Sequence, residues 1–342
     1  MRYIFYIVCV FSLNFLFSQD EAVTKVATCA ANWLKIENGV RGISMGGSQV
    51  ASGRGMTGAY YNPASITYIN GSEAFWSKSY YLADISHNTL AYGTSLSPTD
   101  FFGLHLFYLD SGEMSITTEA APSGTGDSFD VTDLSLRLIY ARQLTDRLRV
   151  GGALKYIREE IHTARMQSFV FDIGSNFDTG IYGLILGMSV SNFGPDVQYK
   201  GEDLSVQVAD TIDVDGSLQR ITDKFPLPLT FRLGVENTVL GPEGSFMKNA
   251  NQTFTISMDG IKSNDYVVTG SMGVEYGWRG LAFLRTGMHL NHDTAGMSLG
   301  TGLNIRLGRM ALNVDYAFVD LSLIHISEPT RPLYISYAVF CL

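Results

Sequence analysis

Residues 134–140 read LSLRLIY, and residues 149–156 read RVGGALKY. In the first stretch Leu134, Leu136, Leu138 and Tyr140 occupy every second position. Ser135 and Arg137 lie between them. In the second stretch apolar residues again alternate with small or charged ones, including Lys155. Because successive side chains of a strand point to opposite faces, this period of two predicts β-strands with one apolar face.

The same alternation recurs from about Ser72 onward and is interrupted regularly by Gly, Asn, Asp or Pro. The strands are roughly 9–11 residues long, which is the length that a tilted strand needs to cross a bilayer. The predicted strands are 72–81, 86–97, 101–109, 112–119, 130–142, 147–158, 165–177, 181–192, 227–237, 252–260, 266–278, 281–290, 295–307 and 309–319.

The two faces of these strands indicate the fold class. One face is large and apolar, and the other mixes small residues with true charges. Short links such as Leu144–Arg147 and Asn291–Thr294 favour an up-and-down meander. We therefore predict an all-β fold, an antiparallel transmembrane β-barrel of about 14 strands. A soluble β-domain whose charged face meets water remains the alternative.

The composition agrees with a barrel. The 342 residues include 35 Gly, 18 Tyr and 20 Phe, which suits a many-stranded sheet with aromatic residues at the membrane interfaces. The net charge of −9 disfavours a nucleic-acid partner, because phosphate neutralisation needs clustered Lys and Arg. Cys29 is the single cysteine between residues 19 and 320, so no disulfide is expected within that part of the chain.

Residues 1–18 have the features of a secretion signal. Arg2 supplies a positive start, Tyr3–Phe17 forms a short apolar run, and Ser18 offers a small residue for cleavage. The apolar run is short for a spanning helix. We expect the mature protein to begin near Gln19 and to reach the cell outer membrane. A retained membrane anchor is the alternative.

Two regions do not alternate. Residues 29–70 are rich in Gly and contain a short helical pattern, Ala30–Ile36. Residues 195–226 form a long polar excursion that is acidic toward Asp210 and Asp215. An insertion of that length on a barrel is usually a functional loop.

Several motifs imitate reactive sites. Gly42–Gly46 matches G-x-S-x-G and Gly53–Gly58 matches G-x-G-x-x-G, but the chain lacks the α/β alternation that gives either motif its meaning. His289 and His292 are spaced like metal ligands without a third ligand. Asp213–Gly216 is a fragment of a calcium loop without the distal Glu. We therefore expect a protein that is not an enzyme, with no catalytic residue, no metal site and no cofactor.

The C-terminal segment has an unusual sequence. Leu321–Arg331 reads LSLIHISEPTR and Ile335–Leu342 reads ISYAVFCL, and both strings resemble the conceptual translation of a sequencing-library adapter. We expect residues 321–342 to be non-native read-through after about Asp320, so that the native closing strand is missing. The alternative is that Tyr334–Leu342 is apolar enough to act as a closing strand.

Three N-terminal segments carry a family resemblance: 33–36 (WLKI), 39–47 (GVRGISMGG) and 59–66 (AYYNPASI). They resemble the N-terminus of the PorV/PorQ family of outer-membrane barrels. Later segments that look like the same family are 133–142, 171–174, 188–194 and 225–229. The resemblance covers most of residues 28–320. The chain departs from it at Gly53–Gly58, where the family more often has an acidic stretch, and at Ser65, where Gly is usual.

The resemblance implies a FadL-like barrel with an N-terminal hatch inside. It assigns residues 19–70 to the N-terminal segment and lumenal hatch, and residues 71–320 to the barrel with its long polar loop at 195–226. Glycines permit the tight paths that a hatch needs, and an Asn-Pro pair makes a rigid turn. The residues that we assign to the hatch motif are Trp33, Arg41, Gly46, Gly47, Asn62 and Pro63.

The resemblance also implies a function in type IX secretion. Members of that type bind exported cargo through its C-terminal signal domain and pass it from the translocon to a surface sortase. The expected partners are then outer-membrane lipid, secreted cargo C-terminal domains, and translocon and sortase proteins, with no nucleic acid. Two alternatives stay open: a FadL-like passive channel for a hydrophobic solute, and a structural envelope barrel.

Overall fold

The computed structural model of the chain describes residues 28–82, 85–207, 217–219, 221–242, 244, 246–308, 310–321 and 336–340. Their regular secondary structure is almost entirely β-strand. The strands are β1 (Ser72–Tyr80), β2 (Ser86–Ser95), β3 (Asp100–Asp110), β4 (Met114–Ser115), β5 (Ser128–Phe129), β6 (Val131–Gln143), β7 (Leu148–Ile161), β8 (Ala164–Asp178), β9 (Leu184–Phe193), β10 (Ser205–Gln207), β11 (Ser217–Gln219), β12 (Thr230–Gly241), β13 (Met247–Lys248), β14 (Gln252–Ser263), β15 (Val268–Trp278), β16 (Ala282–Leu290), β17 (Ala295–Leu307), β18 (Met310–Leu321) and β19 (Ser336–Phe340).

The helices are short. They are η1 (Asn32–Lys35), α2 (Val40–Ser44), η2 (Gly55–Gly58), η3 (Pro63–Tyr68) and η4 (Glu202–Leu204). Within the described ranges, no helix has both the length and the apolar character needed to cross a membrane.

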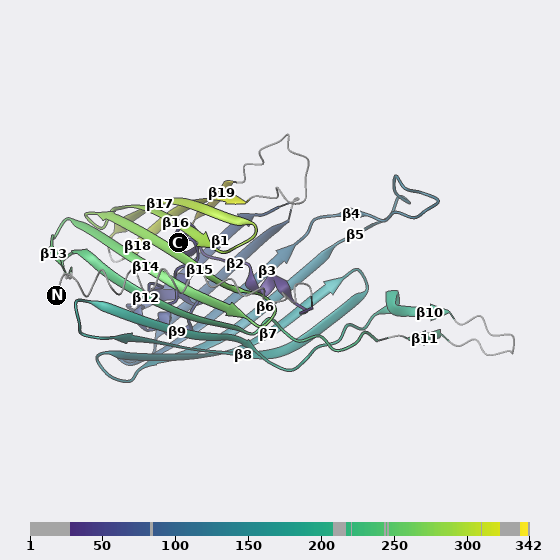
Figure 1. Ribbon diagram of the computed structural model, residues 1–342, viewed down its shortest axis with the longest axis horizontal. Helices are drawn as coiled ribbons and strands as arrows, with labels where there is room; N and C mark the ends of the chain where they lie inside the picture. Colours follow the sequence, from purple (N-terminus) through teal and green to yellow (C-terminus); the bar gives the residue numbers. More distant parts are fainter. Residues whose placement is uncertain are drawn as a thin grey trace.

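One sheet forms the wall of a barrel (Figure 1). Fourteen of the described strands follow one another in the order β1-β2-β3-β6-β7-β8-β9-β12-β14-β15-β16-β17-β18-β19, and each neighbouring pair is antiparallel. The predicted fold class, an antiparallel transmembrane β-barrel of about 14 strands, is confirmed.

One predicted wall strand is wrong. Segment 112–119 lies in the connection between β3 and β6, where its β4 residues pair with β5 in a separate two-stranded sheet. The wall has no room for it, because β3 and β6 pair directly from Asp100↔Arg142 to Asp110↔Thr132. The fourteenth strand of the path is instead β19.

The strand β19 is the last strand of this order and lies between β18 and β1. β19 pairs with β18 from Val314↔Phe340 to Phe318↔Ser336, and its backbone lies against β1. Of the suspected read-through, 321–342, only Leu321 and the backbone of residues 336–340 are described, so its non-native origin stays a prediction. The predicted signal, residues 1–18, and the calcium-loop fragment Asp213–Gly216 lie outside the described residues.

The outer face of the wall is apolar and the inner face is polar. On β8, Phe169, Phe171 and Ile173 are 58%, 52% and 62% exposed on the outside, whereas Asp172 between them is 2% exposed. Arg137 is likewise buried on the inner face of β6. In water the outer face would be a very large exposed apolar surface, which soluble monomers rarely present. A wall with this alternation suits contact with lipid.

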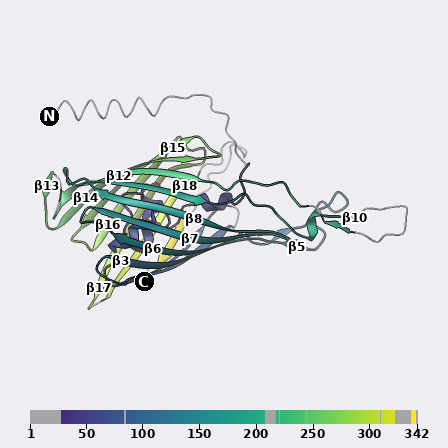
Figure 2. The same ribbon diagram turned by 90° about the horizontal axis from the view of Figure 1, so that it is seen from below.

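The two ends of the barrel differ in their connections. At one end, the short-turn end, most links are brief, such as 96–99, 144–147, 179–183 and 279–281. At the other end, the long-loop end, residues 111–130 and 194–229 make long excursions that carry β4–β5 and β10–β11. The described residues of both excursions, including β4–β5 and β10–β11, extend well away from the barrel in two perpendicular views (Figures 1 and 2).

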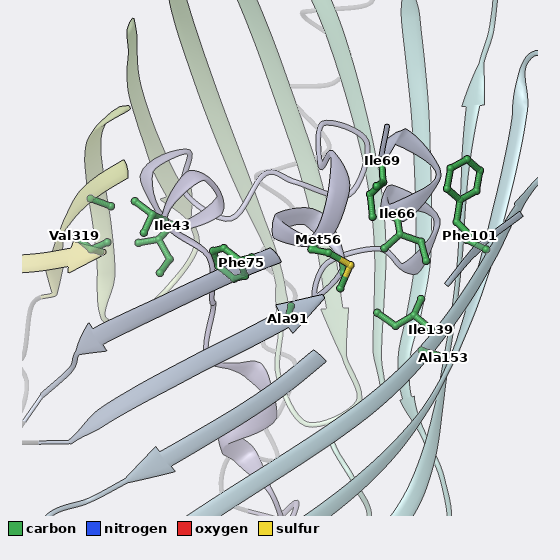
Figure 3. Packing of buried hydrophobic residues seen from close by; sticks show 14 of the residues in the cluster. Ile43, Met56, Ile66, Ile69, Phe75, Ala91, Phe101, Ile139, Ala153 and Val319 are labelled. Carbon is green, nitrogen blue, oxygen red and sulfur yellow. The ribbon is translucent and has the colours of Figure 1, made fainter. Parts of the chain in front are cut away.

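Residues 28–70, which we call the hatch, lie inside the barrel. In the hatch, α2 contacts β16, β17 and β18, and η3 contacts β6, β7 and β8. One apolar cluster joins Met56 and Ile66 of the hatch to Ile139 of the wall (Figure 3). A second cluster joins Trp33 of η1 to Phe107 of β3. The principal apolar packing of the molecule therefore lies between hatch and wall.

Paired glycines let the hatch backbone approach the wall. Four glycine pairs that lie against the hatch stand directly opposite each other across neighbouring strands: Gly93↔Gly103, Gly151↔Gly174, Gly187↔Gly234 and Gly273↔Gly287. A Cβ added to Gly151 would lie 2.6 Å from the backbone nitrogen of Ala64, and one added to Gly187 would lie 2.4 Å from the carbonyl oxygen of Val50. The hatch backbone occupies the space that side chains would otherwise fill, and it does so on several sides of the barrel.

Candidate functional site

A cavity of about 350 Å³ lies between the hatch and the long-loop end. The hatch contributes Lys35, Ile36, Glu37, Ile43, Gly47 and Tyr61 to its lining. The wall contributes residues of β2, β12 and β14 to β18 and of the turns that join β1 to β2, β14 to β15 and β16 to β17. This volume lies in the range of small-molecule sites. Most of the lining surface is apolar, and charged and polar side chains contribute the rest.

On the hatch side of the cavity, a carboxylate lies within hydrogen-bond distance of a histidine ring. Oε1 of Glu37 lies 3.1 Å from Nε2 of His289, a β16 residue. Gly47 makes room for this pair, because a Cβ there would lie 1.9 Å from Oε1 of Glu37. The φ of Gly47 is +79°, a conformation that side-chain-bearing residues rarely adopt. Both features explain a glycine at this position.

Aromatic rings cluster where the cavity meets the long-loop end. The ring centroids of His289 and His292 are 5.5 Å apart, and those of Tyr266 and His292 are 6.4 Å apart. The Tyr266 hydroxyl donates a hydrogen bond to Asp293. In the β16–β17 turn, burial and then the neighbouring His289 lower the pKa of His292, which keeps this ring neutral at neutral pH.

A second hatch charge is also paired. Nζ of Lys35 lies 2.6 Å from Oδ2 of Asp265 in the β14–β15 turn. Burial acts to raise the pKa of Asp265, but hydrogen bonds from Lys35 and Ser263 hold it below its usual range. Asp265 is therefore ionised at neutral pH, and the charge of Lys35 has its counter-ion.

Arg232 of β12 lines the same cavity and is 6% exposed. Its Nη1 donates a hydrogen bond to Oγ of Ser191 at 3.3 Å, and its guanidinium carbon lies 5.7 Å from the ring centroid of Tyr60. No carboxylate within the described ranges makes a salt bridge with Arg232. Its direct contacts are polar and aromatic, and the buried carboxylate of Asp259 on β14 lies near enough for the two charges to interact.

On the short-turn side of the cavity, ion pairs join the hatch to the wall. Arg41 donates to Glu275 through Nε at 2.9 Å and through Nη2 at 3.1 Å. Glu275 also accepts from Nε of Arg285 at 2.6 Å, and Arg285 pairs with Asp315 at 2.5 Å. This chain of charges crosses from the hatch through β15 and β16 to β18.

The six hatch-motif residues are spread over the hatch, and only Gly47 lines the cavity. Nε1 of Trp33 donates to Glu159 of β7 at 3.0 Å. Asn62 caps η3 by accepting from the nitrogen of Ala64 at 3.0 Å, and Pro63 begins that helix. Arg41 makes the ion pair already described. Gly46, with a φ of +62°, passes within contact of β16, where a Cβ would lie 2.7 Å from the nitrogen of Met288.

Most of the cavity residues were not singled out from the sequence. Arg232, Tyr61 and His87 come from the wall and the hatch at distant places in the chain. The alternation predicts that Arg232 faces inward, because it lies between the outward-facing Phe231 and Leu233. It does not predict which other inward-facing residues lie at the same level.

The remaining motif residues have ordinary structural roles. Gly42–Gly46 spans the end of α2 and the turn after it, and Oγ of Ser44 donates to the carbonyl oxygen of Arg41 at 2.9 Å. Two neighbouring carboxylates of β7 also have structural roles: Glu159 points inward and is buried, and Glu160 is half-buried and pairs with Arg158. No group of three or more His, Cys, Asp or Glu side chains that could hold a metal ion is found among the described residues.

Comparison with solved structures identifies the fold. The toluene transporter TodX of Pseudomonas putida aligns with a TM-score of 0.53 at 12% identity, covering 89% of this chain and 96% of that one. The chain has the fold of the FadL-type channels. The monoaromatic hydrocarbon channel CymD and a FadL homologue of Pseudomonas aeruginosa each align with a TM-score of 0.51 at 12% identity, covering 89% of this chain and 95% of theirs. No protein-family model matches the sequence, and no curated protein matches it significantly.

Proposed function

We propose that the protein is an outer-membrane channel that passes a hydrophobic solute passively. The observation that carries this proposal is the largely apolar cavity of about 350 Å³ between the hatch and the long-loop end. It is set in a barrel whose outer face is apolar. TodX and CymD, which share this fold, are channels for toluene and monoaromatic hydrocarbons, and this supports the same class of solute here.

The loops orient the barrel. Outer-membrane barrels have short periplasmic turns and longer extracellular loops, so the long-loop end faces outward and the short-turn end faces the periplasm. The cavity then receives solute from outside the cell. The hatch lies between the cavity and the periplasm, so passage through the lumen requires the hatch to move.

Filling the cavity tests the proposal. Thr269 of β15 lines the cavity and is 9% exposed, whereas Val268 beside it points outward and is 56% exposed. Thr269→Trp should slow uptake of radiolabelled naphthalene by intact cells of a Gram-negative host that has no hydrocarbon channel of its own. Val268→Trp, a matched control on the lipid face, should retain the wild-type rate.

Both variants must show the same heat-modifiable gel mobility as the wild type, which reports a folded barrel. If cells with the wild-type protein take up naphthalene no faster than cells without it, the channel function is wrong. If Thr269→Trp and Val268→Trp are equally active, the cavity is not on the solute's path.

A second proposal is cargo binding in type IX secretion, which the resemblance to the PorV/PorQ family implies. The feature that favours it is the reach of β4–β5 and β10–β11 beyond the barrel, because each two-stranded sheet could add a further strand. Affinity isolation from native membranes tests it. Co-purification of secreted proteins, translocon or sortase supports it, and a preparation free of all three contradicts it.

A further inference from the structure

Aromatic rings line the cavity from several directions. One comes from the hatch, one from β2, one from β16 and three from the long-loop turns. They are Tyr61, His87, His289, Tyr81, Tyr266 and His292. Aromatic side chains prefer offset-stacked or edge-to-face partners, so this lining favours a planar aromatic solute over a flexible alkyl chain.

The volume limits the size of such a solute. A cavity of about 150 Å³ is enough to hold benzene. A cavity of about 350 Å³ therefore accommodates a molecule of one or two fused rings. A larger polycyclic solute would have to extend past His292 and Tyr266 into the long-loop region.

Of the cations that line the cavity, one makes no salt bridge within the described part of the chain. Glu37 is paired with His289, and Lys35 is paired with Asp265. Asp293, which is exposed at the outer limit of the cavity, accepts the hydroxyl of Tyr266. Arg232 is nine-tenths buried and has no salt-bridge partner among the described residues. A buried, unpaired guanidinium is costly, and a carboxylate offers it two parallel charge-assisted hydrogen bonds.

Two other lining residues have unsatisfied polar atoms. Oη of Tyr61 and Nδ1 of His87 are buried and lack a hydrogen-bond partner within the described part of the chain. Buried polar atoms are normally hydrogen-bonded. A ligand with oxygen atoms beside its ring system would satisfy groups of this kind, whereas a pure hydrocarbon would not.

We propose that the cavity is a binding site for an aromatic carboxylate of one or two rings, with Arg232 as its counter-ion. The inference rests on the proposed channel function and narrows its solute class. The ring system lies among the tyrosine and histidine side chains, and the carboxylate lies on Arg232.

Binding of matched ligands tests this class. The full-length protein, held in an amphipathic polymer, is titrated calorimetrically with 2-naphthoate, with its neutral analogue 2-naphthamide, and with octanoate. We expect 2-naphthoate to bind about tenfold or more tightly than 2-naphthamide, because a hydrogen bond to a charged group is worth more than a neutral one. We also expect 2-naphthoate to bind more tightly than octanoate, because octanoate has no ring.

Variants locate the carboxylate. Arg232→Gln should weaken 2-naphthoate binding about tenfold and leave 2-naphthamide unchanged, and Arg232→Lys should keep part of the difference. The matched control is Arg149→Gln. Arg149 is also an inward-facing arginine that makes no salt bridge among the described residues, but it contacts Tyr68 of the hatch near the short-turn end and does not line the cavity. Its loss should change neither affinity.

The outcomes separate the inference from the function on which it rests. Equal affinity of the wild-type protein for 2-naphthoate and 2-naphthamide overturns the carboxylate site but leaves a channel for neutral solutes. Octanoate binding as tightly as 2-naphthoate overturns the preference for rings. If none of the three ligands binds, the cavity is not a solute site, and the channel proposal fails with the inference. The wild-type comparison holds even if a variant does not fold.

Discussion

The guanidinium of Arg41 in the hatch forms a two-point ion pair with Glu275 of β15, with nitrogen-to-oxygen distances of 2.9 and 3.1 Å. Glu275 is shared with Arg285, so a hatch residue is built into the ion-pair chain of the wall. Both side chains of the Arg41–Glu275 pair are largely buried, at 15% and 13% exposure. A two-point pair between an arginine and a carboxylate fixes the relative position of the two side chains and also neutralises their charges. It is one of the contacts that keep the hatch in the lumen.

Removing this arginine should destabilise the barrel. Breaking a buried ion pair typically costs about 3–5 kcal/mol, and the loss here lies at the lower end because Arg285 still neutralises Glu275. Arg41→Ala should therefore lower the temperature at which the folded, fast-migrating gel band is lost. Arg142→Ala removes an exposed pair with Asp100 and should change that temperature little. Equal shifts in the two variants would contradict the anchoring role of Arg41.

Adjacent glycines of β7 provide a matched test of the contact between hatch and wall. A Cβ on Gly151 would lie 2.6 Å from backbone atoms of Pro63 and Ala64, whereas a Cβ on Gly152 would have its nearest neighbour 3.9 Å away. Gly151→Ala should displace η3 and lower the thermal stability, because neither the strand nor the hatch backbone has room to shift. Gly152→Ala should be nearly neutral. A Gly151→Ala barrel as stable as the wild type would show that the hatch is not packed as described.

A disulfide should form between hatch and wall at a chosen place. Oγ of Ser48 lies 2.8 Å from Oγ of Ser257 on β14, and both residues are buried. The double variant Ser48→Cys, Ser257→Cys should oxidise readily, because two side chains this close suit disulfide geometry. Mass spectrometry of a protease digest detects the linked peptides. Ser48→Cys combined with Thr118→Cys in the exposed 111–130 excursion should give no disulfide. A disulfide in this control pair, or the absence of one in the Ser48→Cys, Ser257→Cys variant, would contradict the described position of the hatch.

Cys29 should react slowly with thiol reagents in the folded protein. It is 7% exposed, and burial and then the nearby Asp265 raise the pKa of its thiol. A raised pKa leaves little thiolate at neutral pH, so alkylation should accelerate only as the pH rises above the ordinary range for cysteine. A Cys341→Ser background leaves Cys29 as the only thiol after residue 19. Thr118→Cys serves as the fast-reacting control, and equal rates at the two positions would place Cys29 on the surface.

Part of this structure follows from local sequence alone. The alternation in residues 134–140 determines which side chains of β6 face the lumen, and the same rule placed most of the wall strands within a few residues of their observed limits. The predicted wall strand 112–119 is wrong because local alternation does not show whether a partner strand is free to pair with it. The glycines of the wall are visible in the sequence, but their direct opposition depends on register across strands.

The site was harder to predict because it depends on long-range contacts. Trp33 meets Glu159 across 126 positions of sequence, and Glu37 meets His289 across 252. Such contacts depend on the path of the hatch inside the barrel. A family resemblance singled out hatch residues that hold this path, such as Arg41 and Asn62, and it did not single out the wall residue Arg232 that gives the cavity its charge.

The most direct measurement is solute uptake with the hatch locked and then released in the same cells. Cells that carry the Ser48→Cys, Ser257→Cys variant are given labelled naphthalene after oxidation and again after reduction. We expect uptake at the level of cells without the protein when the disulfide is formed, and recovery of the wild-type rate when it is reduced. Uptake that never exceeds the level of cells without the protein would contradict the channel function. Uptake that is unaffected by the disulfide would contradict passage past the hatch.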